Sequence, residues 1–281
     1  MAFCTREAMG VQFSEMGRED GKTLVLLPGT ACTWQVNFAR VIDALAERYH
    51  LICVNYDGFE GDPSVCFTSV LEVCAKIEDY LIERHGGHVD GAYGSSLGGS
   101  FSALLVQRGR VHVDHAFIGS SDLDQGSPVV ARIMTLIVGP MLSGAAKSEK
   151  KRQKLVDKLV KSLYADEDND EMRTFLDGFS RSFARMHPKT ISREFYSDYV
   201  TPLDDDIHQD GTTIHVIYAL RMDPKGKYLM RYQQHFRDPD LMRFDMQHEE
   251  WLFGSKWTNT VLSAIDERMG ISEDMAGEVR P

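Results

Sequence analysis

The sequence Gly91-Ala92-Tyr93-Gly94-Ser95-Ser96-Leu97-Gly98-Gly99-Ser100 places a serine between two glycines, in the pattern Gly94-x-Ser96-x-Gly98. Residues 89–93 read as the end of a short strand, and the apolar residues of 101–107 continue as a helix. A serine on so sharp a turn takes a strained backbone conformation, and glycines two residues away remove the clash that side chains would cause. A loop that merely turns a corner is the alternative, and the strand and helix at its flanks favour a nucleophilic Ser96 over it.

Apolar runs and helically spaced apolar residues alternate on both sides of this turn. Thr23 to Leu27 and Leu51 to Tyr56 are continuous apolar runs, typical of strands buried on both faces. Helices are expected over 34–49 and 70–81, and a further strand over 113–119. Strands and helices that alternate through short loops predict right-handed crossovers and a mostly parallel sheet.

This alternation stops near Leu123 and resumes at Thr213. The segment between them shows amphipathic helical faces, including one that runs from Leu155 to Leu163. After it we expect a strand over 213–219, a helix over 226–236, a short strand over 241–246 and a closing helix over 250–265. The sequence thus predicts an α/β core over 1–124 and 210–270, a helical cap inserted over 125–209, and a frayed tail over 271–281.

Composition and charge exclude several classes of protein. The 281 residues carry a formal net charge of −11, which disfavours a nucleic-acid partner because such partners need a basic face. The longest apolar run, Val129 to Leu142, is interrupted by Arg132 and Pro140 and is too short to span a bilayer. The 43% of hydrophobic residues suffices for a large core.

Cysteine usage and the N-terminal residues indicate the compartment. The five cysteines are odd in number, scattered, and never spaced as Cys-x-x-Cys, so they indicate reduced thiols and neither disulfides nor a zinc site. Residues 1–7 lack the apolar core of a signal peptide. A cytoplasmic protein that is a monomer or homodimer is therefore expected, with no metal.

With these residues in view, the chain resembles the α/β-hydrolase superfamily with a helical cap. The resemblance covers the core, about two-thirds of the chain, and rests on motif order as well as identity. That family places an oxyanion loop after its third strand, a serine turn after its fifth, a cap after its sixth, an acid after its seventh and a histidine after its eighth. The matching segments here are Pro28-Gly29-Thr30, the Ser96 turn, the insertion from Leu123, Asp223 and His248.

The resemblance implies a role for each matched residue. Ser96 would be the nucleophile, His248 its base and Asp223 the acid that orients the imidazole. The backbone amides of Leu97 and Thr30 would hold the oxyanion, with Ala31 as the fallback for Thr30, because Pro28 replaces the histidine that many members carry there. Asp223 would also suit a turn or helix cap, so four acids remain competitors: Asp122, Asp124, Asp238 and Asp240.

These roles predict a serine hydrolase that needs no cofactor and cleaves a carboxylic ester, or a similar acyl bond, of a small, largely apolar substrate. Acyl transfer, thioester hydrolysis and C–C bond hydrolysis use the same residues. A ligand-binding protein that keeps the fold without the chemistry is the rival class. The cap is expected to set substrate choice, through apolar residues such as Met134, Met141 and Leu142.

Overall fold

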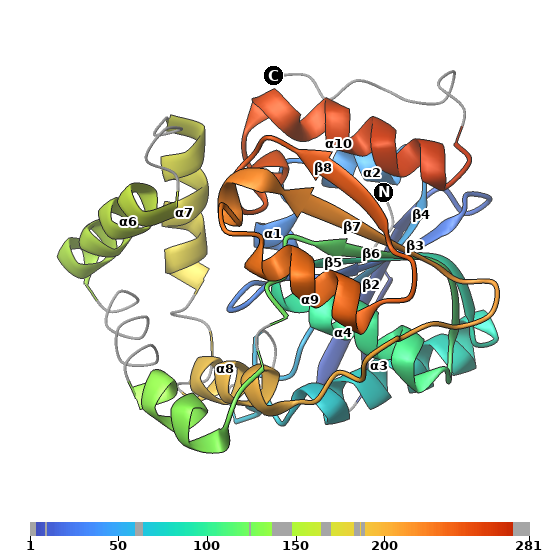
Figure 1. The fold of residues 1–281 in the computed structure, drawn as a ribbon, viewed down its shortest axis with the longest axis horizontal. Helices are drawn as coiled ribbons and strands as arrows, with labels where there is room; N and C mark the ends of the chain where they lie inside the picture. The colour runs from blue at the N-terminus through green and yellow to red at the C-terminus, as the bar shows by residue number, and fades with distance from the viewer. Residues whose placement is uncertain are drawn as a thin grey trace.

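The computed structural model describes residues 4–8, 10–59, 64–123, 125–136, 148–163, 170–182, 186 and 189–271. Its centre is an eight-stranded sheet with the strand order β1-β2-β4-β3-β5-β6-β7-β8 (Figure 1). Strands β3 to β8 are parallel, and β2 pairs antiparallel with both β1 and β4. The mostly parallel sheet that the sequence predicted is confirmed. The strand bounds are Cys4–Ala8, Val11–Gly17, Thr23–Leu27, His50–Asn55, His88–Ser95, His112–Gly119, Thr213–Ala219 and Asp240–Phe244.

Helices cover both faces of this sheet. Helices α1 (Trp34–Asn37), α2 (Ile42–Ala46) and α10 (Ser255–Arg268) lie on one face, while α3 (Val70–His85), α4 (Leu97–Arg108) and α9 (Lys227–His235) lie on the other (Figure 1). Each face has its own cluster of buried apolar side chains. Because apolar side chains of the inner strands are buried on both faces, those strands read as continuous apolar runs.

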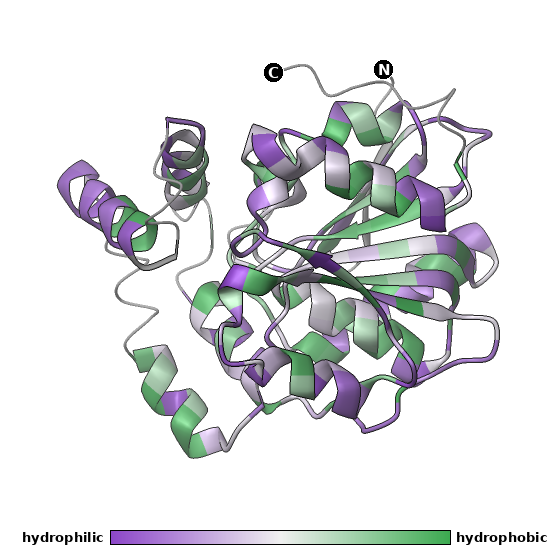
Figure 2. Cartoon of the chain, turned by 45° about the horizontal axis from the view of Figure 1, so that its top comes forward, coloured by the Kyte–Doolittle hydropathy of each residue, from purple (hydrophilic) through white to green (hydrophobic). Residues whose placement is uncertain are grey.

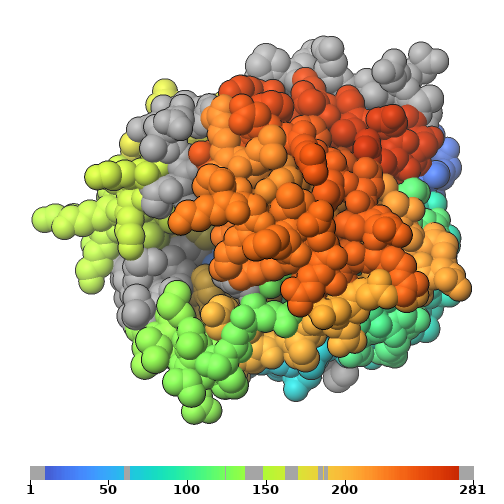
Figure 3. Space-filling model, viewed as in Figure 1, coloured from blue at the N-terminus to red at the C-terminus, as the bar shows by residue number. Residues whose placement is uncertain are grey.

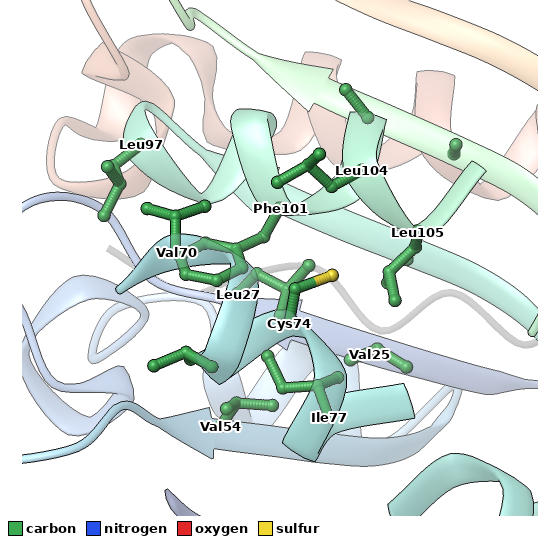
Figure 4. Close-up of a cluster of buried hydrophobic side chains, with 14 of the residues drawn as sticks. Val25, Leu27, Val54, Val70, Cys74, Ile77, Leu97, Phe101, Leu104 and Leu105 are labelled. Carbon is green, nitrogen blue, oxygen red and sulfur yellow. The ribbon is translucent and has the colours of Figure 1, made fainter. Parts of the chain in front are cut away.

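Helix α4, which follows the serine turn, is fixed firmly in one of these clusters. Phe101, Leu104 and Leu105 of α4 lie against side chains of α3 and of the neighbouring strands (Figure 4). All three are fully buried. A well-packed α4 holds its own N-terminus in place, and with it the turn that carries Ser96.

Two expected helices are divided in the structure. The helix expected over 34–49 consists of α1 and α2, and the closing helix consists of the 3-10 turn η4 (Glu250–Leu252) followed by α10. Gly254 separates the latter two with an extended backbone, φ −113° and ψ 139°. Glycine is the weakest helix former after proline, which accounts for a break at this position.

The described parts of the insertion are helical. Residues 128–136 form one helix, and α6 (Glu149–Leu163), α7 (Asp170–Ser182) and α8 (Thr190–Val200) follow. In Figure 2, α6 carries hydrophilic residues along most of its length, with hydrophobic ones toward α7. In the space-filling view α6 projects at the side of the molecule (Figure 3). The exact division into core, cap and tail stays a prediction.

The helix over 128–136 exposes more apolar surface than the sequence led us to expect. Val129, Ile133 and Leu136 are more than half exposed, and Met134 is 50% exposed. Met141 and Leu142 lie outside the described residues. Among the residues that the structure describes, no helix combines the length and the apolar character needed to cross a membrane.

Candidate active site

Ser96 occupies a strained turn between β5 and α4. Its φ of +51° lies in the left-handed region that non-glycine residues rarely adopt. A Cβ on Gly94 would lie 1.9 Å from the carbonyl oxygen of Gly98, and a Cβ on Gly98 would lie 2.1 Å from that of Leu27. Only glycine fits at either position, so the two glycines permit the turn and the strain is retained at Ser96.

The backbone of Ser96 is held from two sides. Its N–H donates to the carbonyl oxygen of Gly119 at the end of β6, at 2.7 Å. The same N–H lies 3.3 Å from Oε1 of Glu249, a residue 153 positions away in the sequence. These contacts fix the turn to the neighbouring strand and to the loop after β8.

Two residues whose backbone amides are unengaged among the described residues line the same cavity as Ser96. Thr30 and Leu97 both line it, and Leu97 begins α4, where the first amides of a helix have no intrahelical acceptor. Within the described part of the chain neither amide has a hydrogen-bond acceptor. The flanking amides are engaged, because Gly29 donates to Oδ1 of Asn37 at 2.6 Å and Ala31 donates to Oε2 of Glu194 at 2.9 Å. The amide of Ala31, the fallback, is therefore occupied.

His248 follows β8 and lines this cavity together with Ser96. Its imidazole is half-buried, with Nδ1 3.2 Å from Sδ of Met222. Burial lowers the pKa of His248 to about 4, and a hydrogen bond to the backbone of Ser120 opposes this shift only in part. The imidazole is consequently neutral near pH 7, which is the form that can accept a proton.

Asp223 lies in the turn after β7 and caps helix α9. Its Oδ2 accepts hydrogen bonds from the Tyr218 hydroxyl and from the amides of Tyr228 and Leu229, at 2.8–3.0 Å, and its Oδ1 accepts one from the amide of Lys227 at 2.7 Å. Among the described residues the structure shows no hydrogen bond between Asp223 and His248. It is the preceding residue, Met222, that contacts the imidazole.

The competing acids occupy different surroundings. Asp122 lines the same cavity as Ser96 and His248. Asp238 is exposed, and Asp240 lies at the start of β8, where it pairs with Arg268 at 2.6 Å. Asp124 lies outside the described residues. Of the described competitors, Asp122 alone shares a cavity with the histidine.

Glu249 is a buried carboxyl group that sequence reasoning missed. It follows His248 directly, with a φ of +51°, and its side chain contacts the backbone of the serine turn. Its Oε2 accepts a 2.5 Å hydrogen bond from the Tyr93 hydroxyl, which in turn accepts one from the Trp251 indole. Burial raises the pKa of Glu249 to about 7, against the hydrogen bonds from Tyr93 and Ser96. The only local signal is the Glu-Glu-Trp-Leu-Phe run that sets acids beside apolar residues.

Glu194 is a second buried carboxyl group that sequence reasoning missed. It comes from α8 in the insertion, is fully buried, and accepts the amide hydrogen of Ala31. Its Oε1 has no hydrogen-bond partner among the described residues. Burial raises the pKa of Glu194 well above its usual range. Through this contact the inserted helices hold the loop that carries the Thr30 amide.

Two cavities meet at Ser96 and His248. The larger, of about 670 Å³, is lined by both polar groups and apolar side chains, including Met134, Phe195 and Tyr228. The smaller, of about 190 Å³, lies between core residues around Ser96 and apolar side chains of α6 and α7, including Leu159, Phe175 and Phe179. Phe175 also stacks on Phe253, with ring centroids 4.5 Å apart. The arrangement offers a roomy side and a narrow apolar side to a ligand that reaches the serine.

The comparisons with known proteins agree with this fold. Residues 24–256 match the model of the alpha/beta hydrolase family. An esterase from the thermophile Thermogutta terrifontis is 11% identical with a TM-score of 0.70, over 99% of this chain and 100% of that one. An esterase from Rhodococcus is 15% identical with a TM-score of 0.68, over 96% and 99%. An enol-lactonase from Burkholderia xenovorans is 12% identical with a TM-score of 0.66, over 96% and 100%. No curated protein sequence is similar enough to the chain to count as a match.

Proposed function

Because the chain belongs to the alpha/beta hydrolase family and is thus a hydrolase, we propose that it cleaves carboxylic esters of small, largely apolar substrates through an acyl-enzyme on Ser96. One observation carries the proposal. Ser96, strained at φ +51°, shares a cavity with a neutral histidine and with two backbone amides that have no acceptor among the described residues. Those are the parts that acyl transfer to a serine requires.

His248 is the proposed general base. Its lowered pKa keeps the imidazole neutral at pH 7, ready to take the Ser96 proton as the hydroxyl oxygen attacks the ester carbonyl. The same imidazole then gives the proton to the leaving alcohol. A water molecule hydrolyses the acyl-enzyme with His248 again as base, and this returns Ser96 to its starting state.

Asp223 is the proposed acid. An ionised carboxylate offers about four lone-pair positions, and among the described residues Oδ1 of Asp223 accepts a hydrogen bond from the Lys227 amide alone. Once the imidazolium forms, its Nδ1–H is better satisfied by this oxygen than by the Met222 thioether. The proposal requires His248 to exchange Met222 for Asp223 when substrate is bound, as catalytic hydrogen bonds often form fully only in the complex. Asp122 is the competing acid.

The amides of Thr30 and Leu97 are the proposed oxyanion hole. A pair of fixed amides stabilises the negative oxygen of the tetrahedral intermediate because no reorganisation is needed as charge develops. Glu194 supports this geometry from α8, since its bond to the Ala31 amide holds the residue that follows Thr30. Glu249 supports it from below by holding the Ser96 amide.

The two cavities suggest the substrate's shape. The smaller cavity suits a short apolar group on one side of the scissile ester, and the larger accommodates a bulkier group beside Met134. The names of the Rhodococcus and Thermogutta structures, both esterases, support ester chemistry for this chain.

We also propose that the protein is cytoplasmic, in keeping with its buried free cysteines, Cys32, Cys53 and Cys74. We propose that it is a monomer or a homodimer.

Turnover of p-nitrophenyl esters of rising acyl length tests the proposal. We expect the wild-type chain to hydrolyse short esters and Ser96→Ala to lose up to about a millionfold in kcat with an unchanged melting temperature. Ser96→Ala removes one hydroxyl and should leave the fold intact. A folded Ser96→Ala variant with full activity would overturn the assignment of the nucleophile. A wild-type chain that binds esters without turning them over would favour the ligand-binding alternative.

A further inference from the structure

A second group of chemically active side chains lies at the opposite end of the sheet. His88 opens β5 and His112 opens β6, and the parallel register pairs these two residues directly. Asp114 is two positions along β6 from His112, and residues two apart on a strand point to the same face. The backbone at this end is tied down, because the amide of His112 donates to the carbonyl of Gly87 at 2.8 Å.

The three side chains converge on one point. Nε2 of His88 lies 2.9 Å from Oδ1 of Asp114, and Nε2 of His112 lies 3.2 Å from the same oxygen. The two imidazole rings are nearly parallel, with centroids 5.6 Å apart. Among the residues that the structure describes, these three alone bring histidine, cysteine or carboxylate donor atoms together in a group of three within 4.8 Å of one another.

We propose that His88, His112 and Asp114 bind a divalent transition-metal ion, with Zn²⁺ as the preferred type. Two imidazole nitrogens and a carboxylate oxygen are a donor set that suits zinc, whereas Ca²⁺ and Mg²⁺ require oxygen ligands. Bond lengths of about 2.0–2.2 Å around a tetrahedral ion put neighbouring donors about 3.3 Å apart. The two nitrogen–oxygen distances are already close to that value, so small side-chain shifts would admit the ion. Water would fill the fourth position, since all three side chains are partly exposed.

A second pair of histidines, His50 and His85, also contacts one carboxylate, that of Glu15, but through its two different oxygens, and these donor atoms do not all lie within 4.8 Å of one another. His215 also contacts a carboxylate, that of Asp240, but the guanidinium of Arg268 lies 2.6 Å from the same oxygen and already supplies a cation there. The cation nearest in sequence to the proposed site, Arg110, is directed elsewhere and bonds to Glu78 and Asp79. A net charge of −11 on the chain also favours a bound cation.

The proposed ion would join the amino ends of two neighbouring strands. Strand β5 has eight residues, so at about 3.3 Å per residue the ion would lie more than roughly 20 Å from Ser96. It would therefore stabilise the fold without taking part in ester hydrolysis. Its presence is independent of whether Ser96 is the nucleophile.

Zinc titration of the metal-free, untagged chain tests the site. We expect isothermal titration calorimetry to show one equivalent bound, with a rise in melting temperature that Mg²⁺ and Ca²⁺ do not produce. His88→Ala and Asp114→Asn should each weaken binding by more than the about 10–100-fold typical of outer-shell substitutions. His208→Ala is the matched control, because His208 is exposed and, in the part of the chain that the structure describes, bonds only to the backbone of Asp206. Its zinc affinity should equal that of the wild type.

Cobalt absorption gives a second readout that does not depend on stability. Co²⁺ in a tetrahedral nitrogen–oxygen site should show visible bands in the wild type and in His208→Ala, and these bands should be absent from His88→Ala. No binding by the wild-type chain, or equal binding by all the variants, would overturn the proposal. Ester turnover should be the same with and without zinc. A change in turnover when zinc is added would contradict the remote location of the ion, and it would leave the proposed hydrolase chemistry untouched.

Discussion

The two ends of β5 hold their reactive groups in opposite ways. At the carboxyl end, Ser96 is strained, and the carboxyl group beneath it, Glu249, is fully enclosed. At the amino end, His88 and Asp114 remain partly in water and are placed by strand register and by their contact with each other. Burial therefore shifts proton affinities at the first end, whereas the second end keeps accessible donor atoms for a ligand that arrives from solvent.

This difference indicates where substitutions should lower activity or stability. At the buried end Glu249 accepts hydrogen bonds from the Tyr93 hydroxyl and the Ser96 amide, so removal of its carboxyl group leaves a buried hydroxyl without this acceptor. At the exposed end water replaces a missing partner at little cost. We expect changes around Ser96 to alter catalysis and stability, and changes around His88 to alter metal binding alone.

The largest effect among these predictions concerns the acid. Asp223→Asn should lower kcat by about four orders of magnitude, because the amide would favour the wrong imidazole tautomer. Asp122→Asn should stay within about tenfold of the wild type. Steady-state ester hydrolysis measures both variants, and melting temperatures show whether loss of the α9 cap has also destabilised Asp223→Asn. A crippled Asp122→Asn beside an active Asp223→Asn would move the acid to the loop after β6.

Glu249 gives the second prediction, on stability against pH. Its pKa is raised from an ordinary 4.5 to about 7 in the folded chain, so its contribution to stability is fully present below pH 4.5 and is lost as the pH rises through 7. The free energy of unfolding of the wild type, relative to Glu249→Gln, should fall by about 3 kcal/mol between about pH 4 and pH 8. Denaturant unfolding at several pH values measures this difference.

The comparison with Glu249→Gln removes the opposite contribution of His248. The pKa of that imidazole is lowered to about 4, so its contribution is present above pH 6.5 and is lost as the pH falls through 4. Because both chains keep His248, the difference between their curves isolates Glu249. Parallel curves over this pH range would show that the Glu249 carboxyl group does not titrate as its burial indicates.

The smallest effect is expected in the insertion. Met134 lines the larger cavity, whereas Leu136 on the same helix is 75% exposed and does not line it. Met134→Ala should relax the preference for ester chain length, by about 1–3 kcal/mol for each additional methylene that the cavity accommodates. Its turnover of an acetate ester should stay within about tenfold of the wild type. Leu136→Ala is the control and should leave the preference unchanged. An equal loss on every ester in folded Met134→Ala would show that this helix affects the chemistry itself.

Local sequence patterns were sufficient for the serine turn and for most strands. The glycines at 94 and 98 are needed within one turn, so their spacing together with the flanking strand and helix predicted it, and the apolar runs of β3 and β7 were located from their own residues. The hairpin of β1 and β2 went unpredicted. Whether Asp223 serves as a cap or as a catalytic acid could not be decided from sequence, because both uses favour aspartate in the same turn.

Long-range contacts could not be predicted in this way. Glu194 reaches the Ala31 amide across 163 positions, and Glu249 reaches Ser96 across 153. A buried glutamate has no periodic signature of its own, since its place follows from the packing of elements that are distant in the chain. The histidine cluster at the amino end likewise depends on the register between β5 and β6, which no single strand specifies.

Covalent labelling of the wild-type chain with a fluorophosphonate tests the central claim most directly. Intact mass spectrometry should show a single adduct, and peptide mapping should place it on Ser96. Ser96→Ala should give no adduct, while His88→Ala should label as the wild type does. An unlabelled wild-type chain, or an adduct on another residue, would contradict the account.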